Sequence, residues 1–565
     1  MDIRNKKVLI LGGWGLVGSA IARKIVAEEP SSIVLTSLKE SEARDICDAL
    51  TKEFGKPEGY FVPFWGNVFI RNKYKDTPRS EYVHDPEKRL DLLGDIVDEL
   101  NEEILKESAI YHMFAEHKPD VVIDCINTAT GIAYANIYKS YNEILGIIKK
   151  GDGDYDALKT SVENLISVSY VPQLIRHIQL LYNSMREFGT SFYLKIGTSG
   201  TGGMGLNIPF THSEEKPSRV LLSKASVAGA HTILLFLMAR TPGGPIVKEL
   251  KPTASIAWKK IAYGEVLNKG VPMKLYDVSM ENTEELGDTF SRKAGKEYKE
   301  TGKLETAFID TGENGIFAKG EFETITSVGQ MEFITPEEIA EAAIDEIKGS
   351  NTGHDIVNAL DASVMEPTYR AGFMQSYAAE KLDELEKKHK TSSVAFEMLG
   401  PPRLTKLLYE AQIIRLIYKN FNNYINSDKG LRSQQITDFL KENPKLVSEI
   451  TSVGLPILMS DGKTILRGPE VLVPGKAEGD NINVTDAQIN KWAHSGWVDL
   501  RAENWDRWES RFKDLIKQAN DDEDRLHSSR YIYNKDYWEN FENINIGKVV
   551  GWLFIYEEDG LRFKR

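Results

Sequence analysis

Short apolar runs alternate with amphipathic stretches over the first 250 residues of the chain. Several runs, such as residues 8–11, are apolar at every position, which is typical of strands buried on both faces. Their alternation with helical patterns predicts a parallel sheet with crossover helices. Six strands are expected, at residues 7–11, 32–36, 59–64, 120–125, 191–196 and 245–250. The intervening helices are expected at residues 16–28, 40–54, 88–116, 160–188 and 219–240.

The pattern becomes less regular after residue 255. The clearest helix there is 336–348, because Thr335 and Glu338 form a capping box and Gly349 follows the last periodic residue. The other expected elements are a strand at 354–358, mostly helical chain over 373–450, and hairpins around Asp461-Gly462 and Asp559-Gly560. The predicted fold class is α/β: a doubly wound parallel Rossmann sheet over residues 1–365, and a mostly helical domain with small β-hairpins over 366–565.

Composition and charge narrow the class of protein. The 565 residues carry a net charge of -14, which disfavours nucleic acid and anionic membrane as partners. The two cysteines, Cys47 and Cys125, cannot build a disulfide framework or a thiolate metal site. The apolar run at 8–11 is too short for a signal sequence, and no stretch reaches the ~18 apolar residues of a membrane span. We therefore expect a cytoplasmic protein that acts on a small molecule without a metal.

A glycine-rich turn joins the first strand to the first helix. Within residues 12–18, Gly12 permits a tight turn, Gly15 lets the backbone approach a pyrophosphate, and Gly18 lets the helix pack closely on the sheet. The free N–H groups at the start of the helix then face the phosphates. The residues expected to hold a nicotinamide dinucleotide in this turn are Gly12, Trp14, Gly15, Leu16, Val17 and Gly18.

The G-x-x-G-x-x-G spacing of this turn resembles that of the short-chain dehydrogenase/reductase superfamily, in its extended, epimerase-like branch. The segment Gly66-Asn67-Val68 is similar to the superfamily's adenine-contacting motif, with Asn in place of Asp. The segment Asn127-Thr128-Ala129 is similar to its motif after the fourth strand. The resemblance implies that Asn67, Val68, Asn127, Thr128 and Ala129 contact the cofactor.

The end of the second strand bears on the choice between NAD and NADP. NAD-binding proteins usually place an acidic residue there to bind the adenosine ribose. This chain has Thr36-Ser37-Leu38-Lys39, and no acid precedes Glu40. Ser37 and Lys39 are able to bind a 2′-phosphate instead, so the sequence favours NADP over NAD.

The catalytic motif of the superfamily is incomplete. The resemblance implies that Ser199 takes the place of the catalytic Ser/Thr and that Lys224 takes the place of the Lys in Tyr-x-x-x-Lys. Residue 220, where the Tyr is expected, is a valine, which cannot transfer a proton. Other candidates for the proton donor are Thr198, Ser199, His212, Lys224 and a tyrosine from the segment 134–141.

Three functions are compatible with this departure. The chain is either an oxidoreductase for a carbonyl or alcohol with a non-standard proton donor, a non-catalytic NAD(P) sensor, or an epimerase or dehydratase that uses the cofactor transiently. The first is preferred. The resemblance also implies a homodimer formed through the helices at 160–188 and 219–240.

Overall fold

The structure is a computed structural model of the full chain. It describes all residues except 79–80, 82–84, 129–136, 152–153, 198–218, 252–255, 269, 312–314, 328–333, 351, 353, 358–368, 397–401, 475–480, 524–532 and 558–565. The described residues form two compact units. The first unit comprises those of 1–203, 217–257 and 332–371, and the second those of 258–331 and 372–565. Residues 258–331, which we had grouped with the N-terminal domain, thus belong to the second unit.

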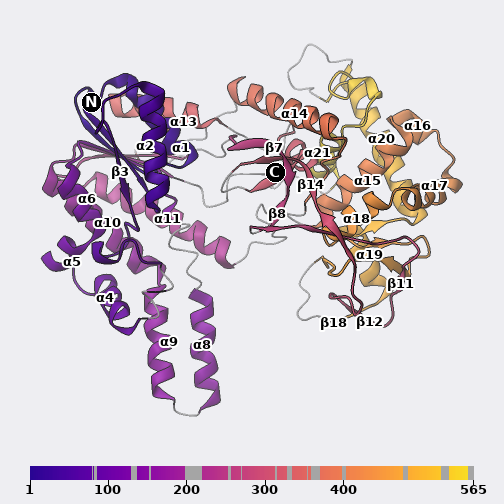
Figure 1. The fold of residues 1–565 in the computed structure, drawn as a ribbon, viewed down its shortest axis with the longest axis horizontal. Helices are drawn as coiled ribbons and strands as arrows, with labels where there is room; N and C mark the ends of the chain where they lie inside the picture. The colour runs from indigo at the N-terminus through magenta and orange to yellow at the C-terminus, as the bar shows by residue number, and fades with distance from the viewer. Residues whose placement is uncertain are drawn as a thin grey trace. The chain divides into compact units, whose positions relative to one another are not determined.

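A six-stranded parallel sheet forms the centre of the first unit, in the order β3-β2-β1-β4-β5-β6 (Figure 1). This is the strand order of the doubly wound Rossmann fold, so the predicted fold class is confirmed. The strands are β1 (Lys7–Leu11), β2 (Ser32–Ser37), β3 (Phe61–Trp65), β4 (Val121–Asp124), β5 (Phe192–Ile196) and β6 (Ile246–Leu250).

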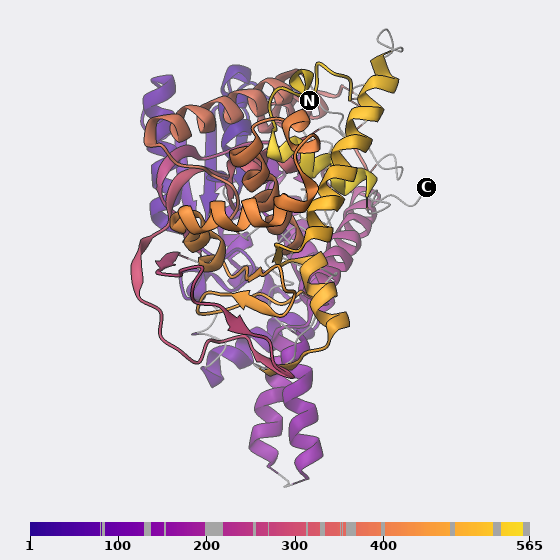
Figure 2. The ribbon, with the colours of Figure 1, turned by 90° about the vertical axis from the view of Figure 1, so that its right-hand side faces the viewer.

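Helices cover both faces of this sheet. The helices of the first unit are α1 (Leu16–Ile25), α2 (Glu40–Phe54), α4 (Pro86–Val97), α5 (Glu102–Glu107), α6 (Ala109–His117), α8 (Ile137–Lys150), α9 (Tyr155–Ser167), α10 (Tyr170–Phe188), α11 (Arg219–Ala239) and α13 (Pro336–Lys348). Helices α8 and α9 form a hairpin that projects from the rest of the unit in two perpendicular views (Figure 1 and Figure 2).

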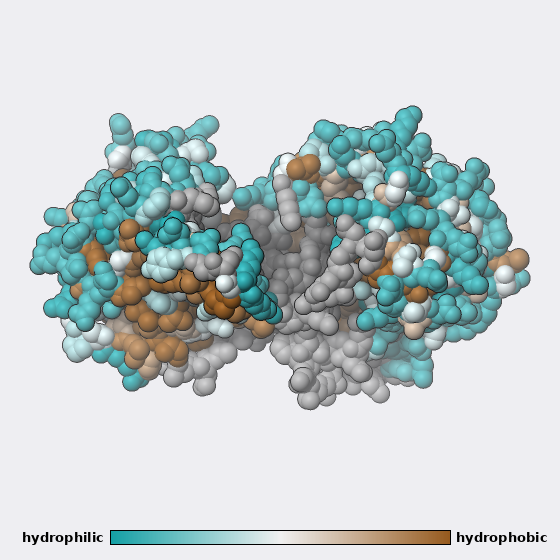
Figure 3. Space-filling model, turned by 90° about the horizontal axis from the view of Figure 1, so that it is seen from below, coloured by the Kyte–Doolittle hydropathy of each residue, from teal (hydrophilic) through white to brown (hydrophobic). Residues whose placement is uncertain are grey.

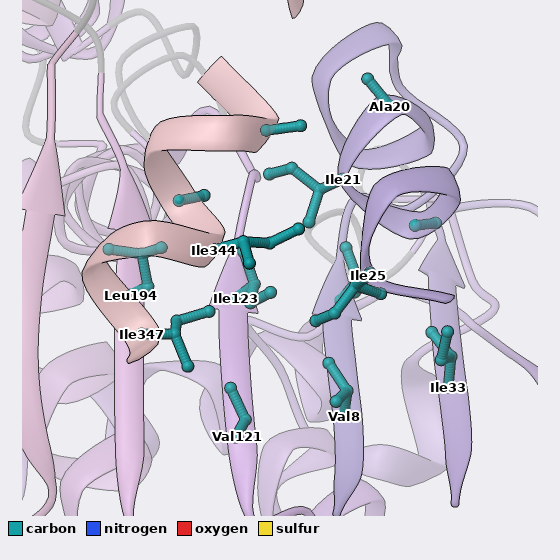
Figure 4. Packing of buried hydrophobic residues seen from close by; sticks show 14 of the residues in the cluster. Val8, Ala20, Ile21, Ile25, Ile33, Val121, Ile123, Leu194, Ile344 and Ile347 are labelled. Carbon is teal, nitrogen blue, oxygen red and sulfur yellow. The ribbon is translucent and has the colours of Figure 1, made fainter. Parts of the chain in front are cut away.

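Alternation along the strands divides the core of the first unit into two layers. Val8, Ile123 and Leu194 point to the face covered by α1 and α13, where they pack against residues such as Ile21 and Ile344 (Figure 4). The opposite layer contains strand residues such as Leu9, Leu11 and Tyr193, with side chains of α6, α10 and α11. Each strand is therefore buried on both faces, which explains the continuous apolar runs in the sequence.

Two helices that we predicted as continuous are interrupted. The 88–116 stretch divides into α4, α5 and α6, because the side chains of Asn101 and Ser108 each accept a hydrogen bond from a backbone N–H of the next turn and start a new helix. The 160–188 stretch divides between α9 and α10. The expected strand at 354–358 is reduced, in its described part, to a single bridge between Asp355 and Leu250.

The second unit is largely helical with several small sheets (Figure 2). Its helices are α12 (Lys319–Ile325), α14 (Tyr369–His389), which begins in the last residues of the first unit, α15 (Pro402–Tyr418), α16 (Phe421–Ile425), α17 (Lys429–Glu442), α18 (Pro444–Ser452), α19 (Asp486–Ser495), α20 (Ala502–Glu523) and α21 (Ile546–Tyr556). Its longer strands are β7 (Lys260–Glu265) and β14 (Glu305–Asp310), which pair antiparallel. The shorter strands are β8 (Leu267–Asn268), β9 (Val271–Pro272), β10 (Lys274–Tyr276), β11 (Glu284–Glu285), β12 (Thr289–Ser291), β13 (Glu300–Lys303), β15 (Ile316–Ala318), β16 (Ile457–Leu458), β17 (Thr464–Leu466), β18 (Asn481–Asn483) and β19 (Val498–Asp499).

One of the two predicted hairpins is confirmed and the other is wrong. β16 and β17 pair antiparallel around Asp461-Gly462. The C-terminal apolar run is instead helix α21, capped by the Asn545 side chain, which accepts a hydrogen bond from the Lys548 N–H. Its residues 546–554, Lys548 excepted, are buried around the whole circumference, and such a run has no amphipathic periodicity that would distinguish helix from strand.

Among the described residues, one helix is long and apolar enough to cross a membrane by these two criteria alone, at Leu222–Ala239 of α11. In the structure α11 packs against α10 and β6 as the crossover helix of the sheet.

Candidate active site

The glycine turn has the geometry that we predicted for it. Gly12 has a φ of +76°, and a Cβ there would lie 3.3 Å from the backbone carbonyl carbon of Cys125. A Cβ on Gly18 would lie 2.3 Å from the Gly12 carbonyl oxygen. No side chain fits at Gly18 without moving this backbone, so helix α1 approaches the turn as closely as backbone contact allows.

The start of α1 is suited to an anion. Gly15 is the N-cap residue and offers no side-chain acceptor to the first N–H groups, and the first turn contains no acidic residue. The helix dipole and these N–H groups therefore favour a negatively charged group. Trp14, Leu16 and Val17 complete this turn, and 39% of the Trp14 surface is exposed. The cradle fits the pyrophosphate of a dinucleotide.

The two residues that we expected to bind a 2′-phosphate both contact an acid. The Ser37 hydroxyl donates to Glu42 Oε2 at 2.6 Å, and Lys39 Nζ lies 3.4 Å from Glu42 Oε1. No acid stands at the end of β2 itself, and Glu42, which was not predicted, lies in the first turn of α2. Helical geometry returns its carboxylate to the end of β2.

The remaining predicted cofactor residues lie at the ends of β3 and β4. Asn67 accepts a hydrogen bond from the Phe69 N–H at 3.0 Å, and Val68 is buried. Asn127 and Thr128 line a cavity described below. Ala129 lies outside the described residues.

The predicted catalytic residues are placed only in part. Lys224 is buried on α11, one turn before Ala228, which lines the same cavity. Ser199, Thr198, His212 and Tyr134 lie outside the described residues, as does the side chain of Val220. The guanidinium of Arg219 lies over the ring of Tyr138, with its Cζ atom 5.2 Å from the centroid of that ring.

A row of charged residues, which we did not predict, crosses the carboxyl ends of three strands. Asp124 of β4 is in register with Lys195 of β5, and Lys195 is in register with Glu249 of β6. All three are at most 2% exposed. Asp124 is also in register with Leu11, whose side chain belongs to the core layer under α10 and α11, so the row faces these two helices.

Asp124 and Lys195 form a fully buried ion pair, with Nζ 2.9 Å from Oδ1. Lys195 also donates to the Ile126 carbonyl oxygen at 2.5 Å and to the Thr128 hydroxyl at 3.3 Å. The Tyr193 hydroxyl donates to Asp124 Oδ2 at 2.7 Å. Burial alone would raise the pKa of Asp124, but the Lys195 charge and these hydrogen bonds outweigh it and lower the pKa. The pair is thus charged and held in a fixed geometry.

Glu249 is less completely paired than Asp124. Its Oε1 lies 3.6 Å from Lys251 Nζ, while its buried Oε2 has no hydrogen-bond partner in the described part of the chain. A Cβ on Gly197 would lie 2.2 Å from Glu249 Oε1, so the carboxylate sits against the end of β5 where only glycine fits. Burial raises the pKa of Glu249, although Lys251, Thr232 and Lys195 oppose the shift. A raised pKa favours the protonated form of the carboxyl, which a general acid requires.

A partly open cavity lies at this end of the sheet, with about 250 Å³ of empty space when the part open to solvent is included. Its lining includes Lys195 and Glu249 of the charged row, His231 of α11 and the backbone position Gly197. Burial lowers the pKa of His231, assisted by the Lys195 charge, so the imidazole is neutral, and its buried Nε2 has no partner. Open α/β sheets bind ligands at the carboxyl ends of their strands, and this cavity occupies that position.

The sequence carried a signal for the charged row. Asp124, Lys195 and Glu249 each stand near the end of a strand that is otherwise mostly apolar. Charged residues are rarely buried unless paired or functional, so a charge inside a continuous apolar strand identifies such a site.

Comparison with known proteins gives one family match. The model of the beta-methylindole-3-pyruvate reductase C-terminal domain matches residues 275–558, just over half of the chain. No curated protein matches the sequence.

The solved structures to which the chain is similar include the following three. Pen from Bacillus thuringiensis is 10% identical, with a TM-score of 0.30, over 69% of this chain and 80% of that one. A short-chain type dehydrogenase/reductase from Mycobacterium ulcerans is 12% identical, with a TM-score of 0.24, over 45% and 68% of the two chains. A short-chain dehydrogenase from Sphingobium yanoikuyae in complex with NADPH is 13% identical, with a TM-score of 0.23, over 45% and 72%.

The family match spans most of the described helices of the second unit, and the Rossmann sheet precedes it in the chain. The chain therefore belongs to the family of the beta-methylindole-3-pyruvate reductase C-terminal domain.

Proposed function

We propose that the chain is a nicotinamide-dependent oxidoreductase that reduces the carbonyl of a small 2-oxo acid. The observation that carries this proposal is the buried row Asp124–Lys195–Glu249, which lines a cavity at the carboxyl ends of β4–β6 of the sheet whose first strand leads into the glycine turn. The reductase named by the family acts on an indolic pyruvate, which supports this substrate class.

The glycine turn and the start of α1 would hold the cofactor pyrophosphate, and Asn127 and Thr128, which line the cavity, would contact the cofactor. When bound, the cofactor supplies the hydride. Reduction of a carbonyl also needs a proton at the carbonyl oxygen, and Val220 cannot provide it. We assign that proton to Glu249, because its pKa is raised and its Oε2 is unpartnered.

Lys195 and His231 have supporting roles in this proposal. The Lys195 charge stabilises the oxyanion that develops on the substrate, and its hydrogen bonds to Asp124 and Thr128 fix it in place. His231 is neutral and lines the same cavity, so it is able to donate a hydrogen bond to the substrate. Lys224, Ser199 and the other residues suggested by the resemblance remain candidates for binding the nicotinamide ribose and the substrate.

The contact of Glu42 with Ser37 changes the expected cofactor. A carboxylate at the end of β2 accepts hydrogen bonds from ribose hydroxyls and repels a 2′-phosphate. The sequence favoured NADP on the strength of Ser37 and Lys39, but both contact Glu42. We therefore propose NAD as the preferred cofactor and NADP as the weaker one.

Titration of the full chain with NADH and NADPH, followed by their fluorescence, tests cofactor binding. Oxidation of bound NADH by indole-3-pyruvate and by β-methylindole-3-pyruvate then tests the reaction. Failure to bind either cofactor would contradict the proposal. Tight binding without turnover of any 2-oxo acid or alcohol would favour a sensor, and turnover without net NADH oxidation would favour an epimerase or dehydratase.

Homodimerisation and a cytoplasmic location are further parts of the proposal. Exposed apolar side chains lie on α10 and α11, where the resemblance implies a dimer interface: Val171, Ile175, Leu222, Ile233 and Leu237. Figure 3 shows hydrophobic surface on the first unit. Light scattering on the full chain should give the mass of a dimer, and Leu237→Asp should reduce it to that of a monomer.

A further inference from the structure

A second cavity lies in the first unit, between the segment after β3 and helices α4, α5 and α10. It is partly open, and its empty space is about 560 Å³ when the part open to solvent is included. Of the described residues predicted to bind the cofactor, none lines this cavity. His177 of α10 contributes to its wall, and the His177 ring lies 6.4 Å from the ring of His231. The cavity is thus separate from the glycine turn but adjacent to the proposed active site.

Arg176 places a buried positive charge in this cavity. The residue is 8% exposed, and its guanidinium Nη2 donates to the Asp98 carbonyl oxygen. Its Nε and Nη1 are buried and have no hydrogen-bond partner among the residues that the structure describes. Burial lowers the pKa of Arg176, which shows how unfavourable this environment is for an unpaired cation. Nε and Nη1 lie on different edges of the guanidinium, so either of them is able to donate one charge-assisted hydrogen bond to a carboxylate oxygen.

The charges of Asp95 and Asp98 act on Arg176 but do not outweigh its burial. Asp95 is held by Arg71 through hydrogen bonds of 2.8 to 3.0 Å from Nε and Nη2. Burial raises the pKa of Asp95, although the hydrogen bonds and charge of Arg71 oppose the shift. Asp98 contacts Arg176 through its backbone carbonyl, and its own side chain is at an exposed position. The Arg71–Asp95 pair is neutral as a unit, and one positive charge remains.

The rest of the wall is mainly apolar. Leu92 and Ile96 of α4, Ile104 of α5 and Leu180 of α10 all line the cavity. His177 adds an aromatic surface: its ring lies 4.7 Å from that of Phe69, and burial lowers its pKa to about 4, so it is uncharged. A ligand here needs an apolar body as well as an anionic group, because bare inorganic anions gain nothing from such walls.

We propose that this cavity binds a small organic carboxylate with a compact aromatic or aliphatic body, its carboxylate on Arg176 and its body between α4 and α10. His177 lies between this cavity and His231 of the proposed active site. A ligand bound in the cavity is therefore able to affect activity at that site. The binding itself does not depend on the proposed function.

Calorimetric titration of the full chain with benzoate tests the site. We expect saturable binding of one benzoate per chain that Arg176→Met weakens at least tenfold. Arg186→Met, which removes an exposed arginine from the same helix, is the matched control and should leave the affinity unchanged. Ile96→Phe, which fills the cavity and keeps Arg176, should also weaken binding, so a folding defect in one variant does not decide the outcome.

Three results would overturn the proposal. One is the absence of benzoate binding, or equal affinity in the wild type and in both cavity variants. Another is equal affinity for inorganic phosphate and for benzoate, which would mean that the apolar walls have no role. A third is displacement of benzoate by saturating NADH, which would place the ligand in the cofactor site; failure of NADH to bind at all concerns only the proposed function.

Discussion

Both units bury glutamates, and the contacts of Glu410 in the second unit differ from those of Glu249 in the first. In the second unit, Glu410 accepts hydrogen bonds from the Asp499 N–H, Asn504 Nδ2 and Trp508 Nε1 at 2.8 to 3.0 Å, and Lys406 Nζ lies 3.3 Å away. Both of its carboxylate oxygens are satisfied. In the first unit, Glu249 keeps a buried Oε2 without a partner, beside a cavity.

This difference separates a structural charge from a functional one. A buried carboxylate surrounded by donors fixes the packing of its neighbours, and nothing is left to bind a ligand. A buried carboxylate with an open oxygen is costly unless a ligand completes its contacts. The first arrangement predicts an effect of mutation on stability, and the second predicts an effect on activity.

The largest expected effect is that of Glu410→Gln on stability. The substitution turns an NH₂ group toward donors and leaves the fully buried Lys406 without a counter-charge. Breaking a buried ion pair in this way costs about 3–5 kcal/mol. Urea unfolding followed by tryptophan fluorescence should show the loss, because six of the nine tryptophans lie after residue 490. Glu442→Gln, at an exposed position on α17, is the control and should change stability by less than about 0.5 kcal/mol.

The next effect is that of Glu249→Gln on turnover. If Glu249 donates the proton, its amide replacement should lower kcat about 100-fold while NADH affinity stays within about twofold, since general acid catalysis contributes at least this factor. Steady-state kinetics with a 2-oxo acid measures the change, and Glu107→Gln at an exposed position is the control. Loss of stability without loss of kcat in the folded enzyme would make Glu249 resemble Glu410 and remove its proposed role.

The fold of the first unit was predictable because its signals are local. Short, mostly apolar runs that alternate with helical patterns located all six strands, and the capping box at Thr335 located α13 with its end at Gly349. The C-terminal hairpin was predicted wrongly because the apolar run of α21 is buried on every side, so neither helical nor strand periodicity was present. Helix boundaries inside 88–116 depended on single capping side chains.

The candidate site was predictable only where one segment of sequence builds it. The glycine turn is such a segment, and its geometry fits the prediction. The row Asp124–Lys195–Glu249 joins three strands that are far apart in the sequence, and only the register of the sheet brings these side chains together. Glu42 was missed for a similar reason, since a helical turn returns it to the end of β2.

A smaller effect concerns Glu449 of α18, a buried acid of the second unit that lacks the donors of Glu410. Burial raises its pKa to about 7, and Lys445 at 3.9 Å opposes this only weakly. The folded pKa lies above the unfolded value of 4.5, so its contribution to stability is complete below pH 4.5 and is lost as the pH rises through 7. Glu449→Gln should therefore match the wild type at pH 4.5 and be more stable by about 2 kcal/mol at pH 8. Urea unfolding at both pH values measures this, and an equal difference at the two would contradict the raised pKa.

The smallest expected effect is on the choice between NADH and NADPH, and it concerns Glu42. This partly exposed acid has more hydrogen-bond and ion-pair partners than Glu249 and fewer than Glu410. Glu42→Gln keeps an acceptor for Ser37 and removes the charge that repels a 2′-phosphate. The affinity for NADPH should rise about tenfold, equivalent to about 1.4 kcal/mol, while that for NADH changes little. Glu40→Gln removes the same charge two residues away, where the carboxylate pairs with Arg44, and serves as the control in the fluorescence titration. If both variants raise NADPH affinity equally, the general negative charge of this helix end sets the preference, and the contact with Ser37 has no special role.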